Sequence, residues 1–365
     1  MDRPLRIGLI APPWVQVPPP DYGGTELVVD VLARGLVRAG HEIVLWTTGD
    51  STCPVERRGV LPVAAGTDAG TDVELHHVSQ AYAALIDCDV IHDHTFLGPL
   101  WAAAEPPSAV VAATVHGPFT AAATTMYRAV GRRVAVIAIS RHQRSTALEV
   151  PVREVIHHGI DLPVAPDDED GRRGGYLLFL GRMCAEKGVH VAIRIARATG
   201  RRLIIAAKMW EPLEHEYFAA EVRPLLGPDV EYIGQVSGRA KAELLAGADA
   251  LLNPIRWPEP FGLVMVEALA VGTPVVTSTA GAAPEIVDHG VTGYLCGSEA
   301  EMVRSLGHLD DIDRAACRRA ARDRFSSERM VADHLRLYRE MLAGAPALPA
   351  GGMGWAAPRV PVGRG

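Results

Sequence analysis

Short apolar runs alternate with longer amphipathic segments along the first half of the chain. The segment Thr25–Ala39 has helical periodicity, ends before Gly40 and lies between two runs of strand length. The predicted strands of this half are Leu5–Ile10, Glu42–Thr47, Val90–His92, Val110–Val115 and Val134–Ile139. Continuous apolar runs bounded by Gly, Pro and polar residues are typical of a parallel sheet with both faces covered.

A polar segment rich in Pro and Gly, Pro163–Gly175, interrupts this pattern and is the expected linker. The alternation then resumes. The predicted elements are strand Leu177–Leu180, helix Val189–Ala198, strands Leu203–Ala206 and Val230–Ile233, helix Lys241–Ala246, strand Ala250–Asn253, a helix after Gly262 and strand Pro274–Thr277. This repetition predicts an α/β protein with two Rossmann-like, doubly wound domains that face each other across a cleft.

The predicted parts of the chain are an N-terminal domain (residues 1–162), a C-terminal domain (163–326), a last helix (327–343) and a tail rich in Ala, Gly and Pro (344–365). Ligands of parallel sheets bind beyond the carboxyl ends of the strands. The cleft between the two domains is therefore the expected site.

Composition excludes several classes of protein. The chain has 365 residues, with 36 basic against 43 acidic side chains, so its net charge of −7 gives no reason to bind nucleic acid. Its five cysteines include no C-x-x-C pair, as in reduced intracellular proteins. No apolar run approaches the roughly 18 residues of a membrane span. We expect a cytoplasmic protein without membrane association, and its content of Ala, Arg and Gly indicates a bacterial source. The oligomeric state stays open.

The segment Pro258–Val276, PEPFGLVMVEALAVGTPVV, combines a stiff loop with the start of a helix. Prolines on either side of Glu259 restrict the loop, and Phe261, Gly262 and Leu263 open the helix. Free backbone N–H groups at a helix start attract an anion, and a glycine there lets a phosphate approach closely. The segment therefore predicts a phosphate site.

Two carboxylates bracket this phosphate site, Glu259 in the loop and Glu267 on the helix. Bound phosphate would repel them unless their own partners are neutral and polar, such as sugar hydroxyls. The pair resembles the signature of glycosyltransferase family 4, the retaining, nucleotide-sugar-dependent enzymes of the GT-B fold. The resemblance implies a catalytic role for Glu259. It implies donor binding by Phe261, Gly262, Leu263, Val264 and Glu267.

The segment Gly181–Gly188, GRMCAEKG, follows a predicted strand and precedes a helix. It resembles the GR…EKG element of the same family, whose Arg and Lys grip the diphosphate. Arg182 and Lys187 would then stabilise the charge that grows on the leaving group as the sugar bond breaks. A helix start disfavours such cations unless an anion intervenes, which supports this interpretation.

Other segments resemble the family less specifically. Gly23 and Gly24 open the first predicted helix, which Thr25 is able to cap, and they form a second possible phosphate cradle. His116 ends a strand where the resemblance implies hydrogen bonds to sugar hydroxyls near the reacting oxygen. The backbone at Val236 follows another strand and would contact the nucleobase. Lys208 either reaches the donor or is solvated.

His92, Asp93 and His94 form the most metal-like triplet of the chain. Alternation along a strand places both imidazoles on one side, but no third ligand is identifiable. A structural role, a place in the acceptor site and a metal site all stay open for the triplet. The family resemblance implies that no metal or other cofactor is required.

The leading hypothesis is a retaining glycosyltransferase that uses a UDP- or GDP-sugar as co-substrate and a small-molecule or saccharide acceptor. A bacterial natural product or envelope saccharide is a plausible acceptor class. Two alternatives are a nucleotide-sugar epimerase of the same fold and a non-catalytic nucleotide-sugar-binding protein. The presence of Arg182, Lys187, Glu259 and Glu267 together argues against a mere binding module.

Overall fold

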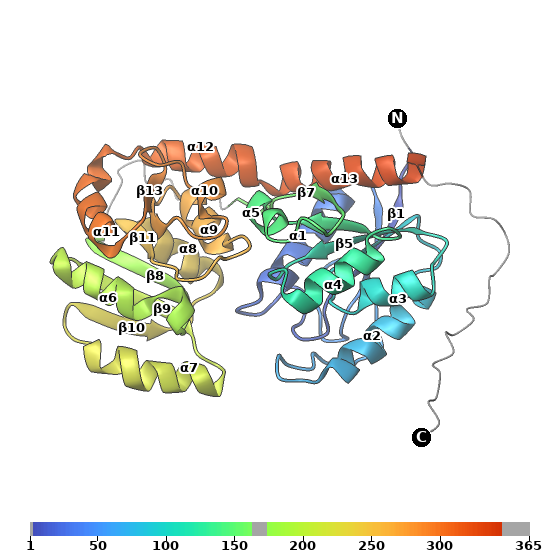
Figure 1. Ribbon diagram of the computed structural model, residues 1–365, viewed down its shortest axis with the longest axis horizontal. Helices are drawn as coiled ribbons and strands as arrows, with labels where there is room; N and C mark the ends of the chain where they lie inside the picture. Colours follow the sequence, from blue (N-terminus) through green and yellow to red (C-terminus); the bar gives the residue numbers. More distant parts are fainter. Residues whose placement is uncertain (1–2, 163–173, 345–365) are drawn as a thin grey trace, which may run out of the picture.

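The computed structural model describes residues 3–162 and 174–344, which form two lobes side by side (Figure 1). The expected linker, apart from Gly174 and Gly175, and the tail beyond Gly344 lie outside the described residues. Both lobes are α/β units built on a parallel sheet, which confirms the predicted fold class.

The N-terminal lobe contains a seven-stranded sheet in the order β3-β2-β1-β4-β5-β6-β7. Its strands are β1 (Arg6–Ile10), β2 (Glu42–Trp46), β3 (Glu56–Arg58), β4 (Val90–Asp93), β5 (Val110–Val115), β6 (Ala135–Ala138) and β7 (Val152–Val155). Its helices are α1 (Gly24–Arg38), α2 (Thr71–Ala84), α3 (Gly98–Ala104), α4 (Ala121–Val130) and α5 (Arg141–Ser145). The order reverses beside β1, so a crevice opens between β1 and β4 at their carboxyl ends.

The C-terminal lobe contains a six-stranded sheet in the order β10-β9-β8-β11-β12-β13. Its strands are β8 (Tyr176–Arg182), β9 (Arg202–Lys208), β10 (Val230–Gly234), β11 (Ala250–Asn253), β12 (Val275–Ser278) and β13 (Gly293–Cys296). Its helices are α6 (Val189–Ala198), α7 (Pro212–Tyr217), α8 (Gly238–Gly247), α9 (Leu263–Ala270), α10 (Ala283–Ile286), α11 (Glu299–Ser305) and α12 (Arg314–Phe325), and α13 (Ser327–Gly344) follows.

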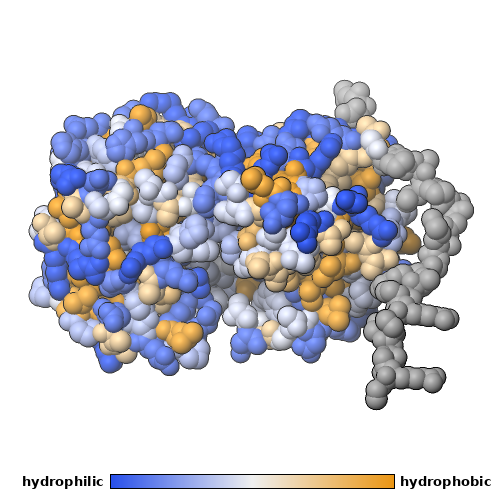
Figure 2. All heavy atoms as spheres, viewed as in Figure 1, coloured by the Kyte–Doolittle hydropathy of each residue, from blue (hydrophilic) through white to orange (hydrophobic). Residues whose placement is uncertain are grey.

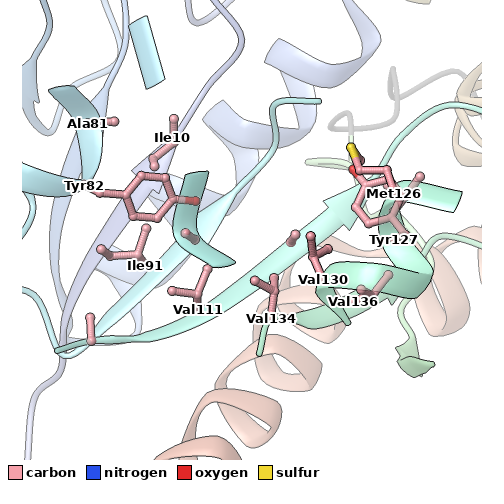
Figure 3. Close-up of a cluster of buried hydrophobic side chains, with 14 of the residues drawn as sticks. Ile10, Ala81, Tyr82, Ile91, Val111, Met126, Tyr127, Val130, Val134 and Val136 are labelled. Atoms are coloured by element: carbon pink, nitrogen blue, oxygen red, sulfur yellow. The ribbon is translucent and has the colours of Figure 1, made fainter. Parts of the chain in front are cut away.

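Each sheet buries both faces, because alternate side chains of a strand point to opposite sides. In β8, Leu177 and Phe179 join the cluster under α6, whereas Leu178 packs on the other side with α8 and α9. Figure 3 shows the corresponding cluster of the N-terminal lobe, where Ile10 and Ile91 from the sheet meet side chains of α2 and α4. The sheets are thus rigid platforms for their carboxyl-end loops.

The last helix, α13, crosses from the C-terminal lobe and packs on the N-terminal lobe, as Figure 1 shows. Its side chains Val331, Leu335 and Tyr338 belong to the same buried cluster as α1 and β1. A Cβ atom at Gly35 of α1 would lie 2.4 Å from Cγ2 of Val331, so a glycine is needed where the two helices meet. The helix α13 therefore completes the core of a lobe whose other elements lie more than 170 residues earlier in the chain.

One local prediction is wrong. Thr25 does not cap the first helix, because α1 already starts at Gly24 and its N-cap is Gly23, without a capping side chain. The elements not individually predicted are helices α2 to α5, α7 and α10 to α12 and strands β3, β7 and β13. Most of them are short, and α2 mixes polar and apolar residues without a clean period.

Candidate donor and acceptor cleft

A cleft of about 640 Å³ lies between the two lobes at the carboxyl ends of both sheets. The surface is indented there in the space-filling view (Figure 2). All the predicted site residues line this cleft: Gly23, Gly24, His116, Arg182, Lys187, Lys208, Val236, Glu259, Phe261, Gly262, Leu263, Val264 and Glu267. Segments that are far apart in the sequence therefore meet at one site.

Glu259 forms an ion pair with Lys187, and both side chains are largely buried. In the structure, the carboxylate of Glu259 is thus the anion that neutralises the lysine at this helix start, and a sugar hydroxyl as its partner in a donor complex stays a prediction. Oε2 of Glu259 is buried without a hydrogen-bond partner, so one oxygen is uncommitted. Gly188 follows with φ 77°, and a Cβ atom there would lie 2.3 Å from the carbonyl oxygen of Pro254, so the turn after Lys187 requires glycine.

Glu267 also has a cationic partner. Its Oε1 accepts a hydrogen bond of 2.7 Å from Nζ of Lys241 on α8, and both groups line the cleft. A neutral hydroxyl as the partner of Glu267 in a donor complex likewise stays a prediction. Sequence reasoning placed Lys241 on a helix but gave it no role, because no local pattern links residues 26 positions apart.

Gly262 turns the chain into α9 with φ 107°, a value that favours glycine. A Cβ atom at this position would lie 2.5 Å from Cε of Met265. No side chain caps α9, so the first N–H groups of the helix remain available beside the cleft. Leu263 approaches Gly24 of the opposite lobe, where a Cβ atom would lie 3.6 Å from its Cδ1.

Arg182 and Lys208 end two adjacent strands of the C-terminal lobe. The Arg182 guanidinium is about one third exposed and lies 3.9 Å from Oε2 of Glu186, a weak contact that leaves it available. Lys208 is buried, with Nζ 3.5 Å from Oε1 of Glu214 and 4.6 Å from the ring centre of Trp210. The solvated interpretation of Lys208 is therefore wrong.

The loop before α1 brings the two walls into contact. Oδ1 of Asp21 accepts a hydrogen bond of 3.0 Å from Oγ of Ser237, and Tyr22 packs edge-on against Trp210 with ring centroids 6.2 Å apart. Burial raises the pKa of Tyr22 to about 12, so its hydroxyl stays protonated. A Cβ atom at Gly23 would lie 2.8 Å from Cβ of Pro19, so a side chain there would displace the loop.

A group of histidine rings lies in and behind the opposite wall, with His116 and His158 lining the cleft. His92 is bonded at both nitrogens, at 2.6 Å to the Tyr338 hydroxyl and at 2.8 Å to the Thr114 hydroxyl. Its ring lies 4.1 Å from that of His94, which confirms that the two share one side of the strand. Asp93 instead accepts hydrogen bonds from Tyr82 and Thr95. The triplet is thus occupied structurally, and residues 3–162 and 174–344 contain no cluster of three ligands suited to a metal.

His116 connects this wall to the cleft. Its Nε2 lies 2.9 Å from Nδ1 of His94, and its ring stacks on His158, with centroids 5.1 Å apart. His158 packs in turn on Phe261 of the other lobe. Burial lowers the pKa of His116 to about 3, so this imidazole is neutral at physiological pH.

A second contact between the lobes lies outside the cleft. Glu285 of α10 accepts hydrogen bonds from the backbone N–H groups of Arg141 and His142 at 2.9 and 2.7 Å, and its Oε2 lies 2.8 Å from Nε2 of His157. Burial raises the pKa of Glu285, but the bonds from His157 and the two amides outweigh it and lower the pKa below its usual value. Sequence reasoning missed this contact, because it joins residues more than 120 positions apart.

Comparison with known proteins identifies the chain. The family model described as Glycosyltransferase Family 4 matches residues 22–163, and the model described as Glycosyl transferases group 1 matches residues 174–310. A glycogen synthase of Mycobacterium tuberculosis is 30% identical over 385 residues, which cover 89% of this chain and 91% of that protein. The chain belongs to glycosyltransferase family 4.

Other family members are similar over most of their length. A phosphatidyl-myo-inositol mannosyltransferase of Mycolicibacterium smegmatis is 29% identical over 80% of each chain. The crystal structure of AviGT4, a glycosyltransferase involved in avilamycin A biosynthesis, has a TM-score of 0.71 and 29% identity, and covers 94% of this chain and 99% of that chain. This family-4 protein is thus a glycosyltransferase with the GT-B fold, and the resemblance seen in its sequence is confirmed. Among its described residues, no helix is long and apolar enough to span a membrane.

Proposed function

We propose that the chain transfers a sugar, with retention at the anomeric carbon, from a nucleoside diphospho-sugar to a small-molecule or saccharide acceptor. One observation carries the proposal: Arg182, Lys187 and the uncapped start of α9 face the same cleft as His116 of the opposite lobe. Cations and free N–H groups on one wall suit a diphosphate, and neutral hydrogen-bonding groups on the other suit a sugar.

The proposed reaction follows from this arrangement. The acceptor oxygen attacks the anomeric carbon from the face that the diphosphate leaves, the bond from this carbon to the phosphate oxygen breaks, and that oxygen takes the acceptor proton. Negative charge on the leaving group grows in this step, so Arg182 and Lys187 stabilise the transition state more than the ground state. Each charge-assisted contact contributes about 1.5–3 kcal/mol.

The ion pairs suggest how the donor enters. Diphosphate would compete with Glu259 for Lys187, which releases the glutamate toward the sugar hydroxyls. Lys241 is similarly shared between Glu267 and the nucleotide end of the donor. The proposal thus keeps the sugar and ribose as partners of the two glutamates, with the lysines as alternate partners.

Thermal unfolding with UDP, GDP and ADP, followed by their sugar conjugates, tests donor binding. A nucleoside diphosphate present at about 100 times its Kd stabilises the fold by about 2.7 kcal/mol. The stabilising donor is then incubated with an acceptor library, and the anomeric configuration of the product is read by NMR. Epimerisation of the donor without any acceptor would overturn the transfer proposal. Inversion in the product would overturn retention alone.

A further inference from the structure

Behind the cleft, His94 forms a hydrogen bond with His116. The two residues follow β4 and β5, which are neighbours in the sheet, and Nδ1 of His94 lies 2.9 Å from Nε2 of His116. Two neutral imidazoles form such a bond only if one nitrogen carries a hydrogen and the other offers a lone pair. The direction of this bond decides the tautomer of His116.

The surroundings of His94 settle that direction. Its second nitrogen, Nε2, is buried and has no hydrogen-bond partner. If His116 were the donor, His94 would carry its hydrogen on this Nε2 and bury an unpaired N–H group. If His94 donates from Nδ1, only a lone pair is left unpaired. Orphaned buried N–H groups are the rarer of the two defects, so His94 is the donor.

His116 accepts at Nε2 and, as a neutral imidazole, carries its hydrogen on Nδ1. That nitrogen has no hydrogen-bond partner among the described residues, but it is not fully buried. His116 also lines the cleft. Nδ1 is therefore accessible from the cleft. Stacking on His158 fixes the ring plane.

The ring of His94 is also held in place. Its centroid lies 4.1 Å from that of the His92 ring, at a tilt of 38°, and His92 is anchored by the hydroxyls of Tyr338 and Thr114 at its two nitrogens. Tyr338 lies on α13, so a helix from the end of the chain supports the second layer of the wall. The bond between His94 and His116 is thus built on fixed groups.

We propose that His94 is a positioning residue that locks His116 in the Nδ1–H tautomer, so that His116 offers a hydrogen-bond donor to the substrate. That this N–H group donates to an oxygen of the transferred sugar rests on the proposed function. A donor at this place does not take a proton from the acceptor hydroxyl. This leaves the proton to the departing phosphate oxygen.

The tautomer is measured first. Histidine labelled with ¹⁵N at both ring nitrogens distinguishes protonated from bare nitrogens by chemical shift, and His116→Asn assigns the signals. In the unmodified protein at pH 7 we expect a protonated Nδ1 and a bare Nε2 in His116. A protonated Nε2 overturns the proposal. This result does not depend on any sugar substrate, so it separates a failure of this inference from a failure of the proposed function.

Kinetics then tests the consequence. His94→Leu removes the hydrogen bond, and turnover should fall about tenfold while donor Kd stays within about threefold. His94→Asn keeps an amide N–H near the Nδ1 position, and should restore most of the loss. His334→Leu is the matched control, because His334 is an equally buried histidine that packs on His92 and Tyr338, and among the described residues its hydrogen bond goes to the carbonyl oxygen of Met330 and not to His116.

A double variant separates positioning from general packing. His116→Asn supplies an N–H donor near Nδ1 without help from a neighbour, so adding His94→Leu in that background should cost little further turnover. If His94→Leu lowers turnover equally in both backgrounds, or if His334→Leu has the same effect, His94 acts through packing and the proposal is wrong.

Discussion

The two walls of the cleft differ in their chemistry. The C-terminal wall carries cations, and Lys187 and Lys241 are each paired with a glutamate. The N-terminal wall carries neutral imidazoles, with His116 at its surface. In the proposed reaction, the paired charges exchange partners when a phosphate binds, whereas the neutral rings keep their hydrogen-bond pattern. The C-terminal wall is therefore suited to a charged group, and the N-terminal wall to hydrogen bonds of fixed direction.

The largest expected effect comes from the charged wall. Lys187→Ala should lower turnover about 10²–10³-fold, because the lysine faces charge that grows in the transition state, and Arg182→Ala should act similarly. The Kd of the nucleoside diphosphate should rise less than about tenfold. Steady-state kinetics and calorimetry measure the two quantities.

Arg239→Ala is the matched control, because Arg239 is 91% exposed on α8 and pairs only with Glu243 among the described residues. The melting temperature is recorded alongside, since Lys187→Ala leaves Glu259 buried without its cation. Near-normal turnover of Lys187→Ala at saturating donor would remove this lysine from the chemistry.

The neutral wall predicts a pH effect on stability. Burial lowers the pKa of His116 to about 3 and of His334 to about 4, and lowers the pKa of His92, His94 and His158 well below the usual value. The unfolded chain binds protons on these residues near pH 6.5, but the folded chain does not. Stability is therefore full above pH 6.5 and falls with pH, by up to about 1.4 kcal/mol per pH unit for each histidine.

Three buried acids act in the opposite direction. Burial raises the pKa of Glu26 to about 7 and of Asp93 to about 6, and it also raises the pKa of Glu74, so the folded chain binds these protons first and gains stability as the pH falls. Five histidines outweigh three acids, and the melting temperature should drop clearly from pH 7 to pH 5. His308→Asn, at an exposed site, should leave the profile unchanged. A flat profile between pH 7 and 5 would contradict a neutral wall.

A smaller effect is expected at the far end of the charged wall. Glu267→Ala should weaken donor binding about tenfold while turnover at saturation stays within about threefold, because a ribose contact is equally present in the ground and transition states. Glu267→Gln, which keeps one oxygen acceptor, should lose less affinity. Equal losses of affinity and turnover would place Glu267 in the chemistry.

The smallest effect concerns the contact between the walls. Ser237→Ala removes the hydrogen bond to Asp21 and should change donor affinity only about twofold, because exposed neutral bonds contribute little. Ser237→Thr keeps the hydroxyl and serves as the control. Calorimetry with the same nucleotide measures both, and a loss beyond about tenfold would show that this contact organises the whole cleft.

The sequence predicted much of the site, because several of its parts are local. Gly262 at a helix start and Arg182 at a strand end follow from the order of apolar and polar residues, and the structure brings them to one cleft. Contacts between side chains that are far apart in the sequence were not predictable. The pairing of Glu267 with Lys241 depends on how α9 packs beside α8, which no local spacing encodes. The bond between His94 and His116 likewise needs the register of two neighbouring strands.

The position of α13 has a consequence for synthesis. Its buried side chains complete the N-terminal lobe, yet they leave the ribosome after the whole C-terminal lobe has been made. Until α13 is synthesised, the apolar side chains of α1 that it covers lack their packing partner. All strands and helices of the C-terminal lobe are synthesised before α13. Vectorial synthesis therefore makes the first lobe to emerge the last one to be completed.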